Sequence, residues 1–87
     1  AYYALAECYL NTNQKSAALN AFKSASAMNF NPIIKEDAFL NYAKLSHEIG
    51  NPYEASSKVL VAFLETYPKN EHVILIEKLL IEKDGAR

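Results

Sequence analysis

Apolar residues recur at intervals of three and four along most of this chain, which is the spacing of amphipathic helices. Short breaks rich in Asn, Gly and Pro divide the pattern into five segments, and none of these segments alternates as a strand would. The first helix is predicted for residues 1–11 and the second for residues 14–28, with Asn13 placed to cap the second. The apolar stripe of the second helix consists of Ala18, Phe22 and Ala25.

The third helix has the clearest predicted boundaries. Asn31 precedes Pro32, and this order suits an N-cap followed by proline in the first turn of a helix. The helix is predicted to reach residue 49, because Gly50 can end it in a left-handed C-terminal cap.

The fourth helix is predicted for residues 52–67. Asn51 before Pro52 repeats the order of cap and proline, and Glu54 stands three residues after Asn51, as in a capping box. Pro68 prevents the helix from continuing, and the fifth helix is predicted for residues 70–83.

Shifting the sequence by 37 residues superimposes small residues on small ones and large apolar residues on large ones. The shift places Ala6 on Ala43 and Ala18 on Ala55, and it aligns both helical pairs and the turns inside them. Such alanines would let two antiparallel helices approach closely, with Ala6 against Ala18 and Ala43 against Ala55. A hairpin cannot bury both of its faces by itself, so we expect successive hairpins to stack.

These positions resemble the tetratricopeptide repeat, a family of stacked helical hairpins. The second copy departs from the family pattern at Ser46 and Val59, and the period of 37 exceeds the family's value of about 34 because of extra residues around 29–32. The first copy carries the pattern, with Tyr and Ala in place of the family's Trp and Gly, as Tyr2-x2-Leu5-Ala6-x2-Tyr9 and Ala18-x3-Phe22.

The resemblance implies an all-α fold of five helices, in which antiparallel hairpins stack as a right-handed α-α superhelix. Residues 1–87 would form one fragment of such an array, with repeats at about 1–31 and 32–68 and the helix of a third repeat, or a cap, at about 70–83. Because the chain starts inside a predicted helix, we expect it to be a piece of a longer protein. Segment 66–70 is similar to hairpin ends in bacterial cell-envelope members of the family, which favours the periplasm or envelope over the cytoplasm.

The resemblance also implies a function, because the first helix of each hairpin in this family lines a concave groove that binds proteins or peptides. The positions that would line this groove are Tyr3, Glu7, Leu10, Asp37, Leu40, Asn41, Lys44 and Glu48. The four at 37, 41, 44 and 48 share one helical face, although such a polar stripe is also typical of the solvent side of a helix. One subtype grips a peptide carboxylate with Lys, Arg and Asn, and Glu7 would repel that carboxylate, so this clamp is not expected.

The fifth helix carries more apolar side chains than one neighbouring helix can cover. Those from Val73 to Ile81 span roughly 260° of the helical wheel at 100° per residue. A terminal cap should instead have a polar outer face. We therefore predict an interface, covered by the next helix of a longer protein or by another copy of the chain, and formed by Ile74, Leu75, Leu79 and Ile81.

Charge and composition weigh against several other functions. Nine basic and ten acidic residues are dispersed and give a net charge of −1, so the basic surface that nucleic acids require is missing. The longest apolar run, residues 73–76, is far too short to cross a membrane. Two alternatives to a protein-binding scaffold stay open. A purely architectural or oligomerising segment is the more favoured of the two, and a helical-repeat RNA-binding protein is the less favoured.

Candidate chemistry is sparse. Cys8 has no neighbouring His, Lys or Arg to activate its thiol, so it is interpreted as a buried or half-buried structural residue. His47 and His72 are far apart in the sequence, a metal site at His47 and Glu48 would need a further ligand, and both histidines are interpreted as solvent-facing. We expect no catalysis and neither a metal nor another cofactor.

Overall fold

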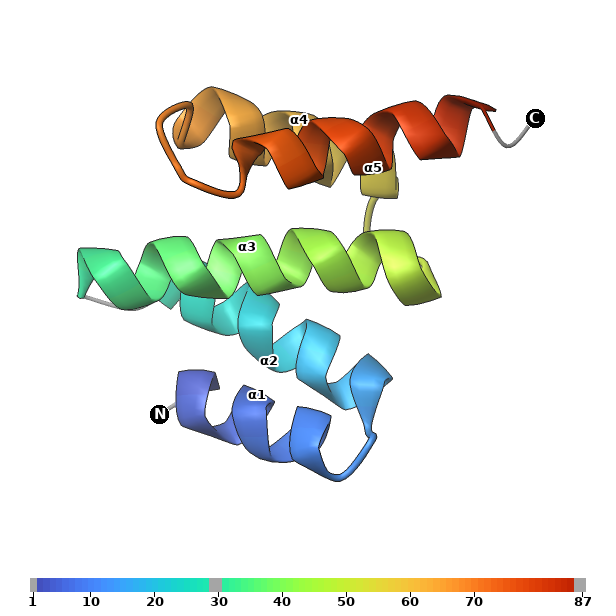
Figure 1. The fold of residues 1–87 in the computed structure, drawn as a ribbon. Coiled ribbons are helices and arrows are strands. Elements are labelled where there is room, and N and C mark those ends of the chain that lie inside the picture. The colour runs from blue at the N-terminus through green and yellow to red at the C-terminus, as the bar shows by residue number, and fades with distance from the viewer. Residues whose placement is uncertain (1, 29–30, 86–87) are drawn as a thin grey trace.

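The computed structural model describes residues 2–28 and 31–85, and within them all regular structure is α-helical (Figure 1). α1, α3 and α5 run in one direction and α2 and α4 in the opposite one, and in Figure 1 α2 passes behind α3 and α4 behind α5. The predicted all-α fold of five helices in antiparallel hairpins is confirmed, whereas the right-handed superhelix stays a prediction. The helices are α1 (Tyr2–Asn11), α2 (Lys15–Met28), α3 (Pro32–Ile49), α4 (Ser56–Thr66) and α5 (Val73–Gly85).

α2 lies between α1 and α3 and packs against both. The three helices meet through alanines that are at most 6% exposed, namely Ala6, Ala18, Ala21, Ala25, Ala38 and Ala43. Because alanine has no side chain beyond Cβ, the helix axes can approach closely at these positions. Leu19 and Phe22 are the largest side chains that α2 buries, and they fill the space between the alanines.

α3, α4 and α5 pack through larger side chains. The ring of Phe63 on α4 is fully buried and meets Phe39 edge to face, with ring centroids 5.6 Å apart, and Tyr67 at 5.5 Å. Such aromatic pairs contribute about 0.5–1.5 kcal/mol beyond the area that they bury. The buried residues Val59, Leu60 and Ile76 belong to the same core.

The second hairpin departs from the predicted repeat at Ala55. This residue is exposed and stands at the N-cap of α4, just before the helix begins at Ser56. The predicted contact of Ala43 with Ala55 is therefore wrong, although Ala43 itself is fully buried. The edge-to-face contact of Phe39 with Phe63 joins α3 and α4 in place of the alanine contact of the first hairpin.

A polar network occupies the turn before α4. Asn51 donates through Nδ2 to the hydroxyl of Tyr42 and to Oγ of Ser46, both at 2.9 Å. The Tyr42 hydroxyl in turn donates to the Glu54 carboxylate at 2.6 Å. Glu54 is therefore engaged by Tyr42, and the predicted capping box is wrong. Asn51 Oδ1 still accepts from the N–H groups of Tyr53 and Glu54, but this turn does not continue into the helix.

α3 begins and ends at the predicted residues. Asn31 Oδ1 accepts from the N–H groups of Ile33 and Ile34 at 2.9 and 3.4 Å, and Pro32 is the first helical residue. At the other end Gly50 has φ 81° and ψ 168°. The positive φ was predicted, but this ψ lies far from the left-handed helical cap.

The turn between α1 and α2 differs from the prediction by one residue. Asn13 has φ 60°, and its N–H donates to the carbonyl of Leu10 at 3.0 Å, so it ends α1 instead of capping α2. The carbonyl of Gln14 accepts from the N–H of Ala18 at 3.0 Å and opens α2. The predicted N-cap at Asn13 is therefore wrong.

α5 begins at Val73, three residues after its predicted start. Asn70 Oδ1 accepts from the His72 N–H at 2.7 Å, and the Asn70 amide donates to the Glu36 carboxylate, which ties the turn between α4 and α5 to α3. Ile76 is fully buried, so this side of α5 faces the core.

We expect Gly50→Ala to lower the free energy of unfolding by about 1–3 kcal/mol, because its φ and ψ are accessible essentially only to glycine. No atom lies within 4 Å of the position that a Cβ would take, so the cost comes from the backbone and not from a clash. Asn13→Gly, at the other positive-φ residue, is the control and should change stability little. Urea unfolding measures both, and an unchanged midpoint for Gly50→Ala would contradict the prediction.

Burial and, second, the hydrogen bond to Glu54 raise the pKa of Tyr42 from 10.0 to about 12. The folded state then holds the phenol proton more tightly than the unfolded chain does. This contribution to stability is complete below pH 10 and is lost as the pH rises through about 12. In urea unfolding at a series of pH values, Tyr42→Phe should therefore show a shallower alkaline fall in stability than the wild type, and parallel curves for the two proteins would refute this.

Candidate functional site

Two open clefts lie along α3 where it approaches α5 and the turn before α5. The first has a volume of about 210 Å³ and is lined by Ile33, Glu36, Asp37, Leu40, Asn70, Glu71 and His72. The second, which we name the α3–α5 cleft, has a volume of about 360 Å³ and is lined by Lys44, His47, Glu48, Leu75 and Leu79. Of the α3 residues predicted for the groove, two line each cleft and Asn41 lines neither.

The α3–α5 cleft has one charged and one apolar wall. Lys44 and Glu48 are exposed and stand one turn apart on α3, while Leu75 is 36% exposed and Leu79 is half-buried on α5. The Glu48 carboxylate forms an ion pair with Lys15 at the start of α2. Lys44 has no such partner among the described residues, so its ammonium group is available to a ligand.

Three other predicted groove residues are engaged with one another between α1 and α3. The Tyr3 hydroxyl donates to the Asp37 carboxylate, and Asn41 Nδ2 donates to the Asp37 backbone carbonyl at 3.0 Å and to Oδ2 at 3.3 Å. The hydrogen bond to Asp37, followed by burial, raises the pKa of Tyr3 above its usual value. The Tyr3 ring also packs edge to face on Phe22 at 6.0 Å. This group fastens α1 to α3, and the Tyr3 hydroxyl, Asp37 Oδ2 and Asn41 Nδ2 are used within it.

The remaining predicted residues lie apart from the α3–α5 cleft. On α1, Glu7 is exposed and Leu10 is half-buried against the core, and neither lines either of the two clefts. Leu40 is 4% exposed and belongs to the core, so only its edge reaches the first cleft. The predicted interface on α5 is also divided, because Ile74 and Ile81 are 78% and 71% exposed on the side away from the cleft.

The sequence interpretation treated His47 as a solvent-facing residue and left it out of the predicted groove. This side chain is half-buried and lines the α3–α5 cleft between Lys44 and Glu48. Its position three residues after Lys44, on the same side of the helix, was the available signal.

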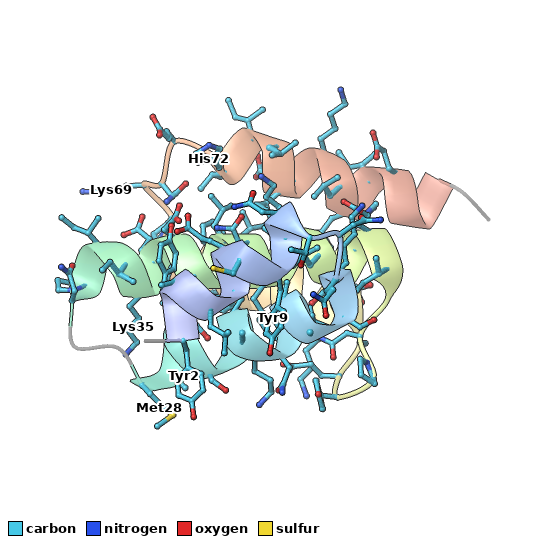
Figure 2. All side chains as sticks on the ribbon, turned by 90° about the horizontal axis from the view of Figure 1, so that it is seen from below. Tyr2, Tyr9, Met28, Lys35, Lys69 and His72 are labelled. Carbon is cyan, nitrogen blue, oxygen red and sulfur yellow. The ribbon has the colours of Figure 1, made fainter. Side chains whose placement is uncertain are left out.

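The interpretation of Cys8 as a buried or half-buried thiol is wrong, because the residue is exposed. Its neighbour Tyr9 packs against the core, which turns Cys8 toward solvent. His72 is half-buried in the turn before α5, where Figure 2 shows it near Lys69. Its ring Nδ1 lies 3.2 Å from Asn70 Oδ1.

Within residues 2–28 and 31–85, no three His, Cys, Asp or Glu side chains are grouped so that they could hold a metal ion. In the same part of the chain, every helix is too short or too polar to span a bilayer.

Comparison with protein-family models, with curated proteins and with solved structures finds no match. The resemblance to tetratricopeptide repeats therefore depends on the residues of this chain alone.

We expect Tyr3→Phe to lower the free energy of unfolding by about 1 kcal/mol, because it removes a half-buried hydrogen bond to a carboxylate. Tyr2→Phe is the matched control, since Tyr2 is 46% exposed at the edge of the molecule and makes no hydrogen bond within the described part of the chain (Figure 2). Urea unfolding compares the two, and equal effects of both substitutions would argue against a stabilising link between α1 and α3.

Proposed function

We propose that this chain is a protein-interaction scaffold whose α3–α5 cleft binds a peptide or a helix by shape and side-chain complementarity, without catalysis. The observation that carries the proposal is the pairing of exposed charges on α3 with apolar side chains on α5 across an open cleft. Binding pockets typically combine an apolar lining with a few polar groups that fix the orientation of the ligand.

The lining favours a ligand with an apolar anchor next to an acidic side chain. Leu75 and Leu79 would contact the anchor, as the apolar faces of grooves do for helical peptides. An acidic group would meet the ammonium of Lys44, while the Glu48 carboxylate already shares its charge with Lys15. The energetic weight lies with the apolar anchor, because exposed ion pairs contribute only about 0–1 kcal/mol.

Two further considerations support binding of protein over binding of RNA. The resemblance to tetratricopeptide repeats associates helices in the positions of α1, α3 and α5 with a binding groove. The net charge of −1 offers little attraction to a phosphate backbone. The alternative is a purely architectural segment, and the exposed Ile74 and Ile81 favour that alternative because they provide an apolar contact surface outside the cleft.

Selection of binders from a displayed library of random peptides, followed by titration of the selected peptide, tests the proposal. We expect Leu75→Asp to weaken binding by at least about tenfold and Lys44→Ala to weaken it by about two- to fivefold. Lys58→Ala and Val61→Asp are the matched controls on α4, where both residues are exposed away from the cleft, and they should leave the affinity unchanged.

Circular dichroism should show the same helicity for all four variants, because each substituted side chain is at least one-third exposed. Failure to select any binder, or binders that tolerate both substitutions in the cleft, would favour the architectural alternative over this proposal.

A further inference from the structure

His47 lines the α3–α5 cleft with ring nitrogens that the protein itself does not use. The ring is half-buried and makes no hydrogen bond or ion pair with any described residue. No buried side-chain nitrogen or oxygen of the described residues lacks a partner, so the unpartnered nitrogens of His47 must be accessible from outside. A neutral imidazole offers one donor and one acceptor, and a protonated imidazole offers two donors. His47 can therefore form hydrogen bonds with a ligand in the cleft.

His47 and Lys44 stand side by side on the charged wall of the cleft. They are three residues apart on α3, which makes them neighbours on the helix surface. Lys44 is exposed and has no ion-pair partner among the described residues. Once His47 is protonated, the wall carries two adjacent cations facing the leucines of α5. A carboxylate suits such a pair, because charge-assisted hydrogen bonds to ionised acceptors are the strong ones.

The other charges around His47 leave this pair free. Glu48, which also lines the cleft, is ion-paired with Lys15 of α2. α5 contributes only Leu75 and Leu79 to the lining, and α4 contributes nothing. The charged residues with described side chains that belong to α4, to α5 or to the turn between them, and that stay outside the lining, are Lys58, Glu65, Lys69, Glu71, Glu77, Lys78 and Glu82.

We propose that His47 is a specificity-determining residue of the α3–α5 cleft, which binds an acidic side chain of a peptide together with Lys44 and binds it more tightly at acidic pH. The proposal rests on the proposed peptide binding and adds to it a second contact and a dependence on pH. Histidine is the side chain that changes charge between pH 5 and 8, whereas the Asp and Glu residues of a peptide stay ionised in that range. A falling pH thus adds a positive charge to the cleft and leaves the negative charge of the peptide in place, so the affinity should rise.

Parallel selections from a displayed library of random peptides, at about pH 5.5 and about pH 7.5, test the proposal. We expect the peptides selected at the lower pH to carry Asp or Glu next to an apolar residue. Titration of one such peptide should show about two- to fivefold tighter binding at the lower pH, the range that a partly exposed ion pair contributes.

Variants of the protein assign the effect to His47. His47→Gln keeps a hydrogen-bonding group but cannot become charged, so the affinity of this variant should be the same at both pH values. Lys44→Ala should weaken binding at both pH values and keep the rise at the lower one. His72→Gln is the matched control, because the other histidine of the chain lies in the first cleft next to Asn70, and it should keep the full pH dependence.

A variant of the peptide tests the same contact without any change to the protein. Replacing its Asp or Glu by the corresponding amide removes the negative charge, and the pH dependence should disappear with the wild-type chain. Circular dichroism of all proteins at both pH values should show the same helicity.

The two proposals fail in different ways. A peptide that Leu75→Asp weakens, but that binds equally at both pH values or keeps its pH dependence with His47→Gln, would overturn the role of His47 and leave peptide binding in place. Selected peptides without Asp or Glu would do the same. Failure to select any peptide at either pH would overturn both proposals.

Discussion

The close contact of α2 with α1 and α3 is the interaction on which the rest of the structure depends. Small residues on all three helices allow the approach, and Phe22 and Leu19 are buried as a consequence. Replacing a buried alanine by a larger side chain would force the helices apart, since interiors are packed too densely to absorb the added volume. The position of α3 follows from this contact, and α3 then provides the surface against which both α4 and α5 are placed.

The local chemistry of the chain predicts the fold better than it predicts the side-chain contacts. The proline and Asn31 at the start of α3 act within a few residues, so they can be interpreted directly from the sequence. The turn before α4 could not be predicted in this way, because Asn51 had a plausible local role as a cap while its amide is used by Tyr42 and Ser46. The aromatic cluster around Phe63 was missed for the same reason, since it depends on how α3 and α4 cross.

The candidate site likewise combines features that the sequence predicts with contacts that it does not predict. Lys44 and Glu48 could be identified because four-residue spacing places them on one face of a helix. That Leu75 and Leu79 stand opposite them depends on the approach of α5 to α3, which no local pattern specifies. Tyr3 and Asp37 are 34 residues apart, and both were predicted to contact a ligand. Their hydrogen bond to each other links α1 to α3 instead. One side of α5 thus lines the cleft, while Ile74 and Ile81 are exposed on another side.

Hydrogen bonds attach the turns before and after α4 to α3. Asn70 reaches Glu36 near the start of α3, and the network of Tyr42, Asn51 and Glu54 holds the turn at its far end. Hydrogen bonds are directional, so these two attachments restrict the angle of α4 and α5 to α3 as well as their distance from it. The walls of the cleft are therefore preorganised: a ligand that enters it finds α3 and α5 already in place, and little conformational entropy of the backbone is lost on binding.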